Sequence, residues 1–202
     1  MSVRLDPVPA LDAALAMLAR GPRAVVLVDG RSGSGKTTFA AALARSGRCA
    51  LLRLEDVYPG WDGLAAASEI LVDRVLQARA AGLPAVLHRW DWAGDRLGAP
   101  LPVPSGGPLV VEGCGALSHR AAALVPGGRV WVDLPDDERR TRALERDGDG
   151  YAPHWERWAR QERAFLAREE PVRSADVVVD GRHFPQPVFS ASTGNTHYPR
   201  RP

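Results

Sequence analysis

Short apolar runs and amphipathic stretches alternate along this chain. Five largely apolar runs, bounded by glycine, proline or charged residues, lie at 24–29, 50–54, 109–111, 129–133 and 176–179. Near-continuous apolar runs of this length are typical of strands that are buried on both faces of a parallel sheet. We therefore predict five core strands.

Longer stretches with apolar residues at helical spacing separate these runs. In the segment 65–81, Ile70, Leu71, Val75 and Leu76 fall on one face of a helix. Similar patterns and their flanking residues predict further helices over 10–19, 37–45, 135–146 and 154–169. Strands that alternate with helices indicate an α/β fold with a parallel sheet.

Three remaining segments are interpreted differently. Residues 85–88 are predicted as a further short strand. Residues 89–108 are rich in Gly, Pro, Trp and Asp and are predicted as a long loop, of the kind that often carries function. Residues 182–202 contain four prolines and little periodicity, so we predict a C-terminal extension there. Residues 1–181 are then expected to form a single domain.

Composition narrows the class of protein. The chain has 202 residues, 45% hydrophobic and 25% charged, as in ordinary globular domains. Its 26 basic residues nearly balance 24 acidic ones, which argues against nucleic-acid binding through bulk charge. No apolar run approaches the length of about 18 residues that a membrane span needs, so we expect a cytoplasmic protein without membrane contact. Cys49 and Cys114 are predicted to be buried thiols, and the five histidines show no metal-ligand spacing.

The strongest chemical signal follows the first strand. Residues 30–37 fit the pattern G-x-x-x-x-G-K-[ST] between a buried strand and a helix, which is the setting of a phosphate-binding loop (P-loop). Glycines let the backbone N–H groups of such a loop approach phosphate oxygens, and the N-terminus of the next helix adds a favourable field. We predict that the phosphates of ATP bind to Gly30, Ser32, Gly33, Ser34, Gly35, Lys36, Thr37 and Thr38.

Lys36 is the single lysine among the 26 basic residues, so the remaining 25 are arginines. A planar guanidinium is broader than an ammonium and fits a P-loop poorly. The one lysine therefore stands where a compact charge is needed to reach the β- and γ-phosphates, and we predict a catalytic role for it. The hydroxyl of Thr37 is predicted to bind Mg²⁺.

Further segments accompany the P-loop in a fixed order. They are Leu54-Glu55-Asp56-Val57-Tyr58, Trp90-Asp91-Trp92 with Arg96, Val110-Val111-Glu112-Gly113, and Val132-Asp133 followed by Arg139, Arg142 and Arg146. In this order, over residues 24–180, the chain resembles the uridine kinase-like nucleoside kinases, which are P-loop NTPases. The resemblance implies a parallel five-stranded sheet in the order 2-3-1-4-5, flanked by helices, with a small helical lid over residues 139–170. It also implies transfer of the γ-phosphoryl group of ATP, with Mg²⁺, to a hydroxyl group.

Two carboxylates are predicted to serve this chemistry. Asp56 follows the second strand, near the edge of the sheet where a P-loop ligand binds, and it can accept the proton of an attacking hydroxyl. The resemblance gives Asp56 the role of the base. Glu112 ends the third strand and can hold a Mg²⁺-bound water. A turn-forming Asp56 and a solvated Glu112 are the plainer alternatives.

Three arginines, Arg139, Arg142 and Arg146, share one face of the helix predicted over 135–146. The resemblance makes them lid arginines that close on the transferred phosphate, with Arg142 and Arg146 catalytic and Arg139 binding the nucleotide. In an arginine-rich chain the same spacing is also typical of an exposed helix with surface ion pairs.

The acceptor is expected to bind among aromatic and polar side chains. Aromatic rings can stack on a base, and a carboxylate can accept hydrogen bonds from ribose hydroxyls. The resemblance assigns this site to Asp56, Tyr58, Trp61, Asp62, Asp91, Trp92 and Arg96. The segment 90–96 is one residue shorter than the family's segment and lacks its histidine, so a pyrimidine base is not implied.

The leading hypothesis is an ATP-dependent kinase for a hydroxyl group of a small molecule, in the first place a nucleoside. The nearest alternative is a kinase of nucleoside monophosphates, other metabolites or antibiotics. A monophosphate acceptor needs additional arginines near 60–80; only Arg74 and Arg79 lie there, within a predicted helix, which favours an uncharged acceptor. A nucleotide-binding regulatory ATPase is the alternative of another class. We expect ATP and a small acceptor as partners, with neither nucleic acid nor a membrane, and the sequence is compatible with a homo-oligomer.

Overall fold

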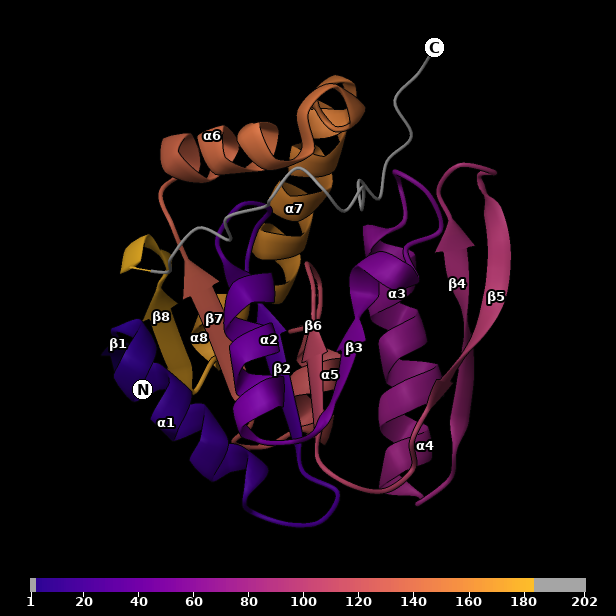
Figure 1. The fold of residues 1–202 in the computed structure, drawn as a ribbon, viewed down its shortest axis with the longest axis vertical. Helices are drawn as coiled ribbons and strands as arrows, with labels where there is room; N and C mark the ends of the chain where they lie inside the picture. Colours follow the sequence, from indigo (N-terminus) through magenta and orange to yellow (C-terminus); the bar gives the residue numbers. More distant parts are fainter. Residues whose placement is uncertain (1–2, 184–202) are drawn as a thin grey trace.

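The computed structural model describes residues 3–183, which form an α/β fold around a six-stranded sheet (Figure 1). All strand pairs of this sheet are parallel, and the strand order is β1-β8-β7-β2-β6-β3. The strands are β1 (Val3–Leu5), β2 (Val25–Asp29), β3 (Ala50–Arg53), β6 (Leu109–Glu112), β7 (Arg129–Asp133) and β8 (Val177–Asp180). The predicted class of fold, with a parallel sheet flanked by helices, is confirmed.

The prediction of five strands in the order 2-3-1-4-5 is wrong in the number of strands and therefore in the full order. The sixth strand, β1, pairs in parallel with β8 at the edge of the sheet, with Val3 opposite Val177. A three-residue strand is too short to leave a recognisable periodicity. The five strands predicted from the apolar runs lie beside one another as β3-β6-β2-β7-β8.

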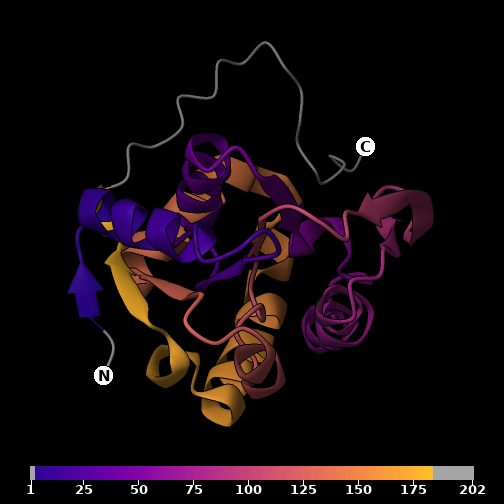
Figure 2. The same cartoon turned by 90° about the horizontal axis from the view of Figure 1, so that it is seen from below.

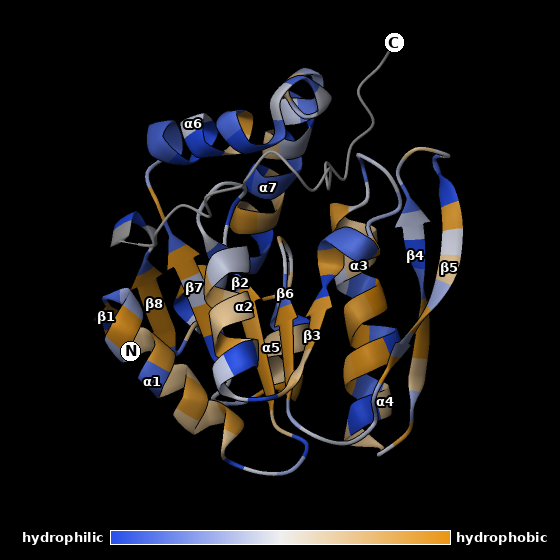
Figure 3. Ribbon diagram, viewed as in Figure 1, coloured by the Kyte–Doolittle hydropathy of each residue, from blue (hydrophilic) through white to orange (hydrophobic). Residues whose placement is uncertain are grey.

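Helices cover both faces of the sheet (Figures 1 and 2). Helices α1 (Pro7–Leu18) and α2 (Lys36–Ser46) lie on one face, and α5 (His119–Leu124), α7 (Trp155–Glu169) and α8 (Pro171–Ser174) lie on the other. Side chains of β2 alternate between two cores, because Val26 and Val28 pack with the first pair of helices and Leu27 with the second group. Burial on both faces explains why β2 and β6 are apolar up to the acidic residue that ends each of them (Figure 3).

The helix predicted over 65–81 is present as one helical segment. It comprises α3 (Leu64–Ile70), a π-helical stretch (Leu71–Leu76) and α4 (Gln77–Ala80). The side chains of Leu71, Val72, Val75 and Leu76 are buried in the core.

The long loop predicted over 89–108 is wrong for most of its length. Strands β4 (Ala85–Asp91) and β5 (Arg96–Val103) form a separate antiparallel hairpin beside α3 and α4 (Figure 1). Two prolines of β5 lie opposite His88 and Val86 of β4. Proline is tolerated here because β5 pairs with β4 on one side only, so its N–H positions on the other side need no strand partner. The proline and glycine content concealed the strand pattern.

The segment predicted as a lid consists of α6 (Asp136–Asp147), two 3-10 turns (Gly148–Gly150 and Ala152–His154) and α7. Helix α6 lies above the end of the sheet in Figure 1. The described chain ends in a further 3-10 turn (Gly181–His183), and most of the predicted C-terminal extension lies outside the described residues. Within residues 3–183, none of the helices combines the length and the apolar character that crossing a bilayer requires.

Candidate functional site

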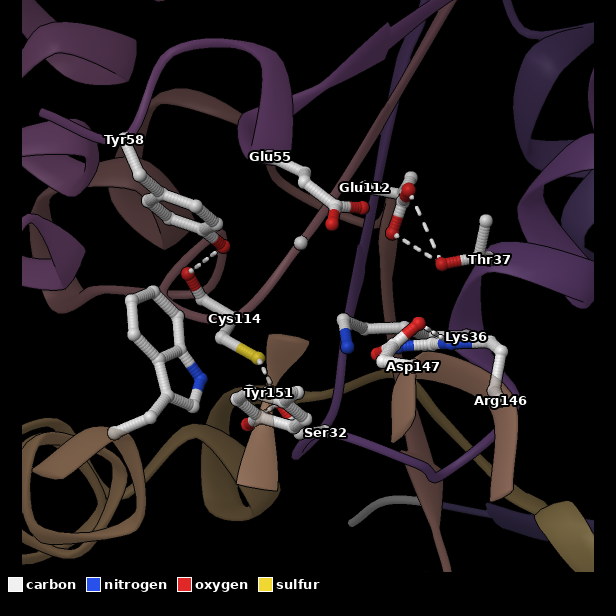
Figure 4. A pocket seen from close by; sticks show the side chains of 12 residues that line it. Ser32, Lys36, Thr37, Glu55, Tyr58, Glu112, Cys114, Arg146, Asp147 and Tyr151 are labelled. Carbon is white, nitrogen blue, oxygen red and sulfur yellow. Dashed lines mark hydrogen bonds and ion pairs between the residues drawn. The ribbon is translucent and has the colours of Figure 1, made fainter. Parts of the chain in front are cut away.

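A pocket lies where strands β2, β3 and β6 end. The carboxyl ends of parallel strands meet at one edge of a sheet, so the segments that follow these three strands come together there. Helices α6 and α7 contribute the remaining wall. The pocket is lined by Ser32, Lys36, Thr37, Glu55, Tyr58, Glu112, Gly113, Cys114, Arg146, Asp147, Tyr151 and Trp158 (Figure 4).

The P-loop connects β2 to the first turn of α2. Gly33 and Gly35 have φ angles of 82° and 97°, a left-handed region that favours glycine, and α2 begins at Lys36. A side chain at Gly33 would collide with the backbone of Arg139 in α6. The glycine spacing therefore serves two purposes, because it shapes the loop and lets the lid helix approach it.

Asp29, the last residue of β2, joins the P-loop to the segment after β6. Its buried carboxylate accepts hydrogen bonds from the N–H groups of Gly30 (2.7 Å), Gly115 (3.2 Å) and Leu117 (2.8 Å). Burial raises the pKa of Asp29 to about 7, although the backbone donors and Lys36 oppose the shift. Asp29 was not predicted for the site, because it precedes the P-loop pattern at 30–37 and is not part of it.

Thr37 and Glu112 lie side by side at the floor of the pocket. The Thr37 hydroxyl donates to the Glu112 carboxylate, at 3.2 Å and 3.3 Å from its two oxygens. Burial raises the pKa of Glu112, while Lys36 opposes the shift. A hydroxyl and a carboxylate are ligands that suit Mg²⁺, which normally completes its shell with water and phosphate oxygens. Within residues 3–183, no group of three or more His, Cys, Asp or Glu side chains is arranged to hold a metal ion.

Lys36 lies in the same pocket among acidic groups. Burial disfavours its charge, but Cys114, Glu112 and Glu162 outweigh burial and raise the pKa of Lys36 above its ordinary value. The ammonium is therefore retained at neutral pH, where it can neutralise the charge of a bound anion.

The 3-10 turn Leu54–Asp56 directs two neighbouring acids differently. Glu55 lines the pocket, and its side chain faces the same space as Glu112 and Lys36 (Figure 4). Asp56, the acid predicted as the base, is absent from the lining residues and forms an ion pair with Arg89 of β4 at 2.6 Å. Of these two acids, Glu55 is the one that faces the P-loop.

Part of the predicted acceptor site comes together. The Tyr58 hydroxyl donates to the carbonyl of Cys114 (2.8 Å), and its ring lies edge-on to Trp158 with centroids 4.8 Å apart. Trp61 stacks on His154, with centroids at 4.0 Å, and lies 5.1 Å from Trp92. These contacts bring the turn after β3, the hairpin and the lid together, but of the three aromatic residues predicted for the acceptor only Tyr58 lines the pocket.

Three other residues predicted for the acceptor site are paired elsewhere. Asp62 forms an exposed ion pair with Arg157 of α7. Asp91 accepts the N–H groups of Ala93 and Gly94 at the tip of the β4–β5 hairpin and lies 3.5 Å from Arg96. Asp62, Asp91 and Arg96 are thus absent from the lining of the pocket.

The three predicted lid arginines have different surroundings. Arg146 lines the pocket and donates two hydrogen bonds to Asp147, at 2.9 Å and 2.6 Å. Arg142 instead donates to the carbonyl of Gly181 at 2.7 Å, beside the end of the sheet. Arg139 is buried next to Glu162, and its guanidinium lies 5.3 Å from the centroid of the Trp155 ring. Arg146 is therefore the lid arginine that faces the pocket.

Several lining residues were not predicted for the site. The hydroxyl of Tyr151 donates to that of Ser32 at 3.0 Å, and Trp158 packs on Tyr58. Cys114 lies against the P-loop, with its thiol 3.4 Å from the carbonyl of Gly30, and burial raises the pKa of Cys114 to about 12. Each looks like an ordinary core residue in the sequence, although Cys114 follows β6 and Trp158 lies in α7.

Comparisons with known proteins bear on the fold. No protein-family model and no curated protein matches the chain. A possible uridine kinase from Bacillus stearothermophilus superposes with a TM-score of 0.60 at 20% identity, over 85% of this chain and 98% of that one. A candidate fructose transport system kinase from Silicibacter superposes with a TM-score of 0.53 at 18% identity, over 86% and 98% of the two chains. The resemblance of this chain to the uridine kinase-like P-loop kinases is thus confirmed at the level of the fold.

Proposed function

We propose that the protein transfers the γ-phosphoryl group of ATP to a hydroxyl group of a small molecule. One observation carries the proposal: a P-loop lysine, a Thr37–Glu112 pair suited to Mg²⁺ and the carboxylate of Glu55 line one pocket. P-loop kinases need these three functions, and they need them within reach of one phosphate.

Each side chain has a defined task in this proposal. The P-loop N–H groups and Lys36 hold the phosphates, and Thr37 and Glu112 hold Mg²⁺, which neutralises phosphate charge when bound. The acceptor hydroxyl gives its proton to a carboxylate as its oxygen forms the new bond to phosphorus, while the bond from the γ-phosphorus to the leaving oxygen of ADP breaks. Arg146 is suited to stabilise the charge of the migrating group, after exchanging Asp147 for phosphate.

An uncharged acceptor suits the pocket best. Its cationic lining residues are Lys36 and Arg146, which the ATP phosphates would occupy. Arg79 is buried, where it donates to the carbonyl groups of Pro104 and Gly107, and Arg74 is exposed on the helical segment. Neither is placed to bind a monophosphate in this pocket. The aromatic side chains favour an acceptor with a planar or apolar face, such as a nucleoside.

The acceptor can be found by measuring ADP release. Purified protein with Mg²⁺ and ATP is screened against nucleosides, nucleoside monophosphates, sugars and other hydroxylated metabolites. We expect uncharged hydroxyl compounds to raise the rate of ADP release at least about tenfold above the basal rate, with a phosphorylated product visible by mass spectrometry. If none of the acceptors raises the rate, the kinase proposal fails.

Two matched variants, Glu55→Gln and Asp56→Asn, identify the base. Each keeps the shape of the side chain and removes its basicity. Because Glu55 faces the pocket and Asp56 is paired with Arg89, we expect Glu55→Gln to lower kcat by about 100-fold or more and Asp56→Asn to lower it severalfold at most. The reverse ranking would assign the proton transfer to Asp56, as the sequence suggested.

A regulatory ATPase is the alternative of another class. Such a protein would hydrolyse or retain ATP at a rate set by a macromolecular partner. Release of ADP that no small acceptor increases, in a protein that binds ATP tightly, would favour this alternative.

A further inference from the structure

A buried carboxylate in α7 holds the outer part of the P-loop. Glu162 is 2% exposed, and its Oε1 accepts the N–H of Ser32 at 2.7 Å, while its Oε2 accepts the Nε–H of Arg31 at 3.1 Å. The Cys114 thiol also lies 3.5 Å from Oε1. Both oxygens are thus used, and both bind consecutive residues of the loop.

The same carboxylate connects the loop to helix α6. The guanidinium of Arg139 is buried 3.6 Å from Glu162 and also donates to Asp136, which lies 2.7 Å from Arg31. Asp136 is exposed, so Glu162 is the buried counter-ion that the guanidiniums of Arg31 and Arg139 share. One carboxylate therefore joins the P-loop, α6 and α7.

Glu162 contacts the P-loop without lining the pocket. The pocket lining includes Ser32 and Cys114, which contact Glu162, but Glu162 itself is absent from it. Glu162 therefore acts on the pocket through the loop residues that it holds.

We infer that Glu162 is a positioning residue, which holds the P-loop and the base of the lid in the arrangement that binds ATP. The inference rests on the proposed function, because it assigns the binding of a nucleotide to this loop. An anion nest depends on several N–H groups that point to one centre, so a loop free to shift at Ser32 binds phosphate less tightly. Without the carboxylate, two guanidiniums also remain close together with little to balance them.

The test is the affinity of the whole protein for ATP, measured by calorimetry without an acceptor. For Glu162→Gln we expect a Kd that is higher by about tenfold or more, equivalent to about 1.4 kcal/mol of binding free energy. With an acceptor present, the KM for ATP should rise by a similar factor and the KM for the acceptor by less than about twofold. The control is Glu156→Gln, an exposed acid on the same helix, which should match the wild type.

A merely structural role would lower the melting temperature and leave the Kd for ATP unchanged in the folded protein, which would overturn the inference. If Glu162→Gln does not fold, the double variant Glu162→Gln/Arg139→Met removes one unpaired guanidinium, and the same rise in Kd is expected of it. A wild-type protein that binds no ATP would refute the proposed function itself. Normal binding by both the wild type and the variant would refute the role of Glu162 alone.

Discussion

Lys36 is the first residue of α2, and its ammonium lies among Glu112, Glu162 and the thiol of Cys114. We expect Lys36→Ala and Lys36→Arg to lower kcat by at least about 100-fold. The first variant removes the charge, and the second replaces a compact ammonium with a broader guanidinium. Circular dichroism and thermal melting should show a folded protein in both cases. A folded Lys36→Ala protein with near-normal turnover would contradict the assignment.

Asp29 gives the stability of the protein a specific dependence on pH. Its pKa is about 7 in the folded protein and 3.8 in the reference state, so the folded state binds more protons between these values. The free energy of unfolding should therefore fall as the pH rises from about 4 to about 7, by up to about 1.4 kcal/mol per pH unit from this group. In Asp29→Asn this contribution disappears.

Urea unfolding of the wild type and of Asp29→Asn, at intervals from pH 4.5 to pH 7.5, measures this contribution. The difference between the two proteins should change steadily across the range, favouring the variant as the pH rises. Two parallel profiles would show that Asp29 does not titrate in this interval.

At the scale of residues, the sequence predicted side chains whose spacing is set by a motif. Lys36, Thr37 and Glu112 meet as expected, because the P-loop pattern and a strand end fix their positions. The choice between Glu55 and Asp56 could not be made, because adjacent acids differ only in the direction that a 3-10 turn gives them. Glu162 gave no signal at all, since its P-loop partners Arg31 and Ser32 lie about 130 residues away in the chain.

At the scale of elements, the contact between the P-loop and α6 depends on a missing side chain. In Gly33→Ala the new methyl group would meet the backbone of Arg139, and the residue would also keep a φ near 82°. We expect a loss of at least about 2 kcal/mol in the free energy of unfolding by urea. Gly106→Ala is the control, because a methyl group there meets nothing within 4 Å, and its effect should stay within about 0.5 kcal/mol. Equal stability of the two variants would contradict the close packing of α6 on the loop.

The elements that sequence patterns predicted are those with a long or fully buried signal. Strands β2 and β7 are buried on both faces, and α7 has a clear amphipathic pattern. Strands β1 and β5 were missed for different physical reasons. The first has three residues, and the second is an exposed strand with two prolines, where pairing with β4 rather than a core decides the structure.

At the scale of the whole molecule, the pocket depends on the parallel order of the sheet. The lining residues from Ser32 to Cys114 reach one space because β2, β3 and β6 lie side by side and end at the same edge. The sequence could predict this convergence, since it follows from parallel pairing. It could not predict the contacts of the lid with that edge, because they depend on the angle at which α6 and α7 cross it.

The position of Lys36 also determines how the protein meets reagents that modify amines. The chain has one ε-amino group, and it lies in the wall of the pocket with a raised pKa, which keeps it protonated and weakly nucleophilic. Acylating reagents and lysine acetylation therefore have a single side-chain target in this molecule. Acylation of Lys36 would therefore also remove the charge on which the phosphate site depends.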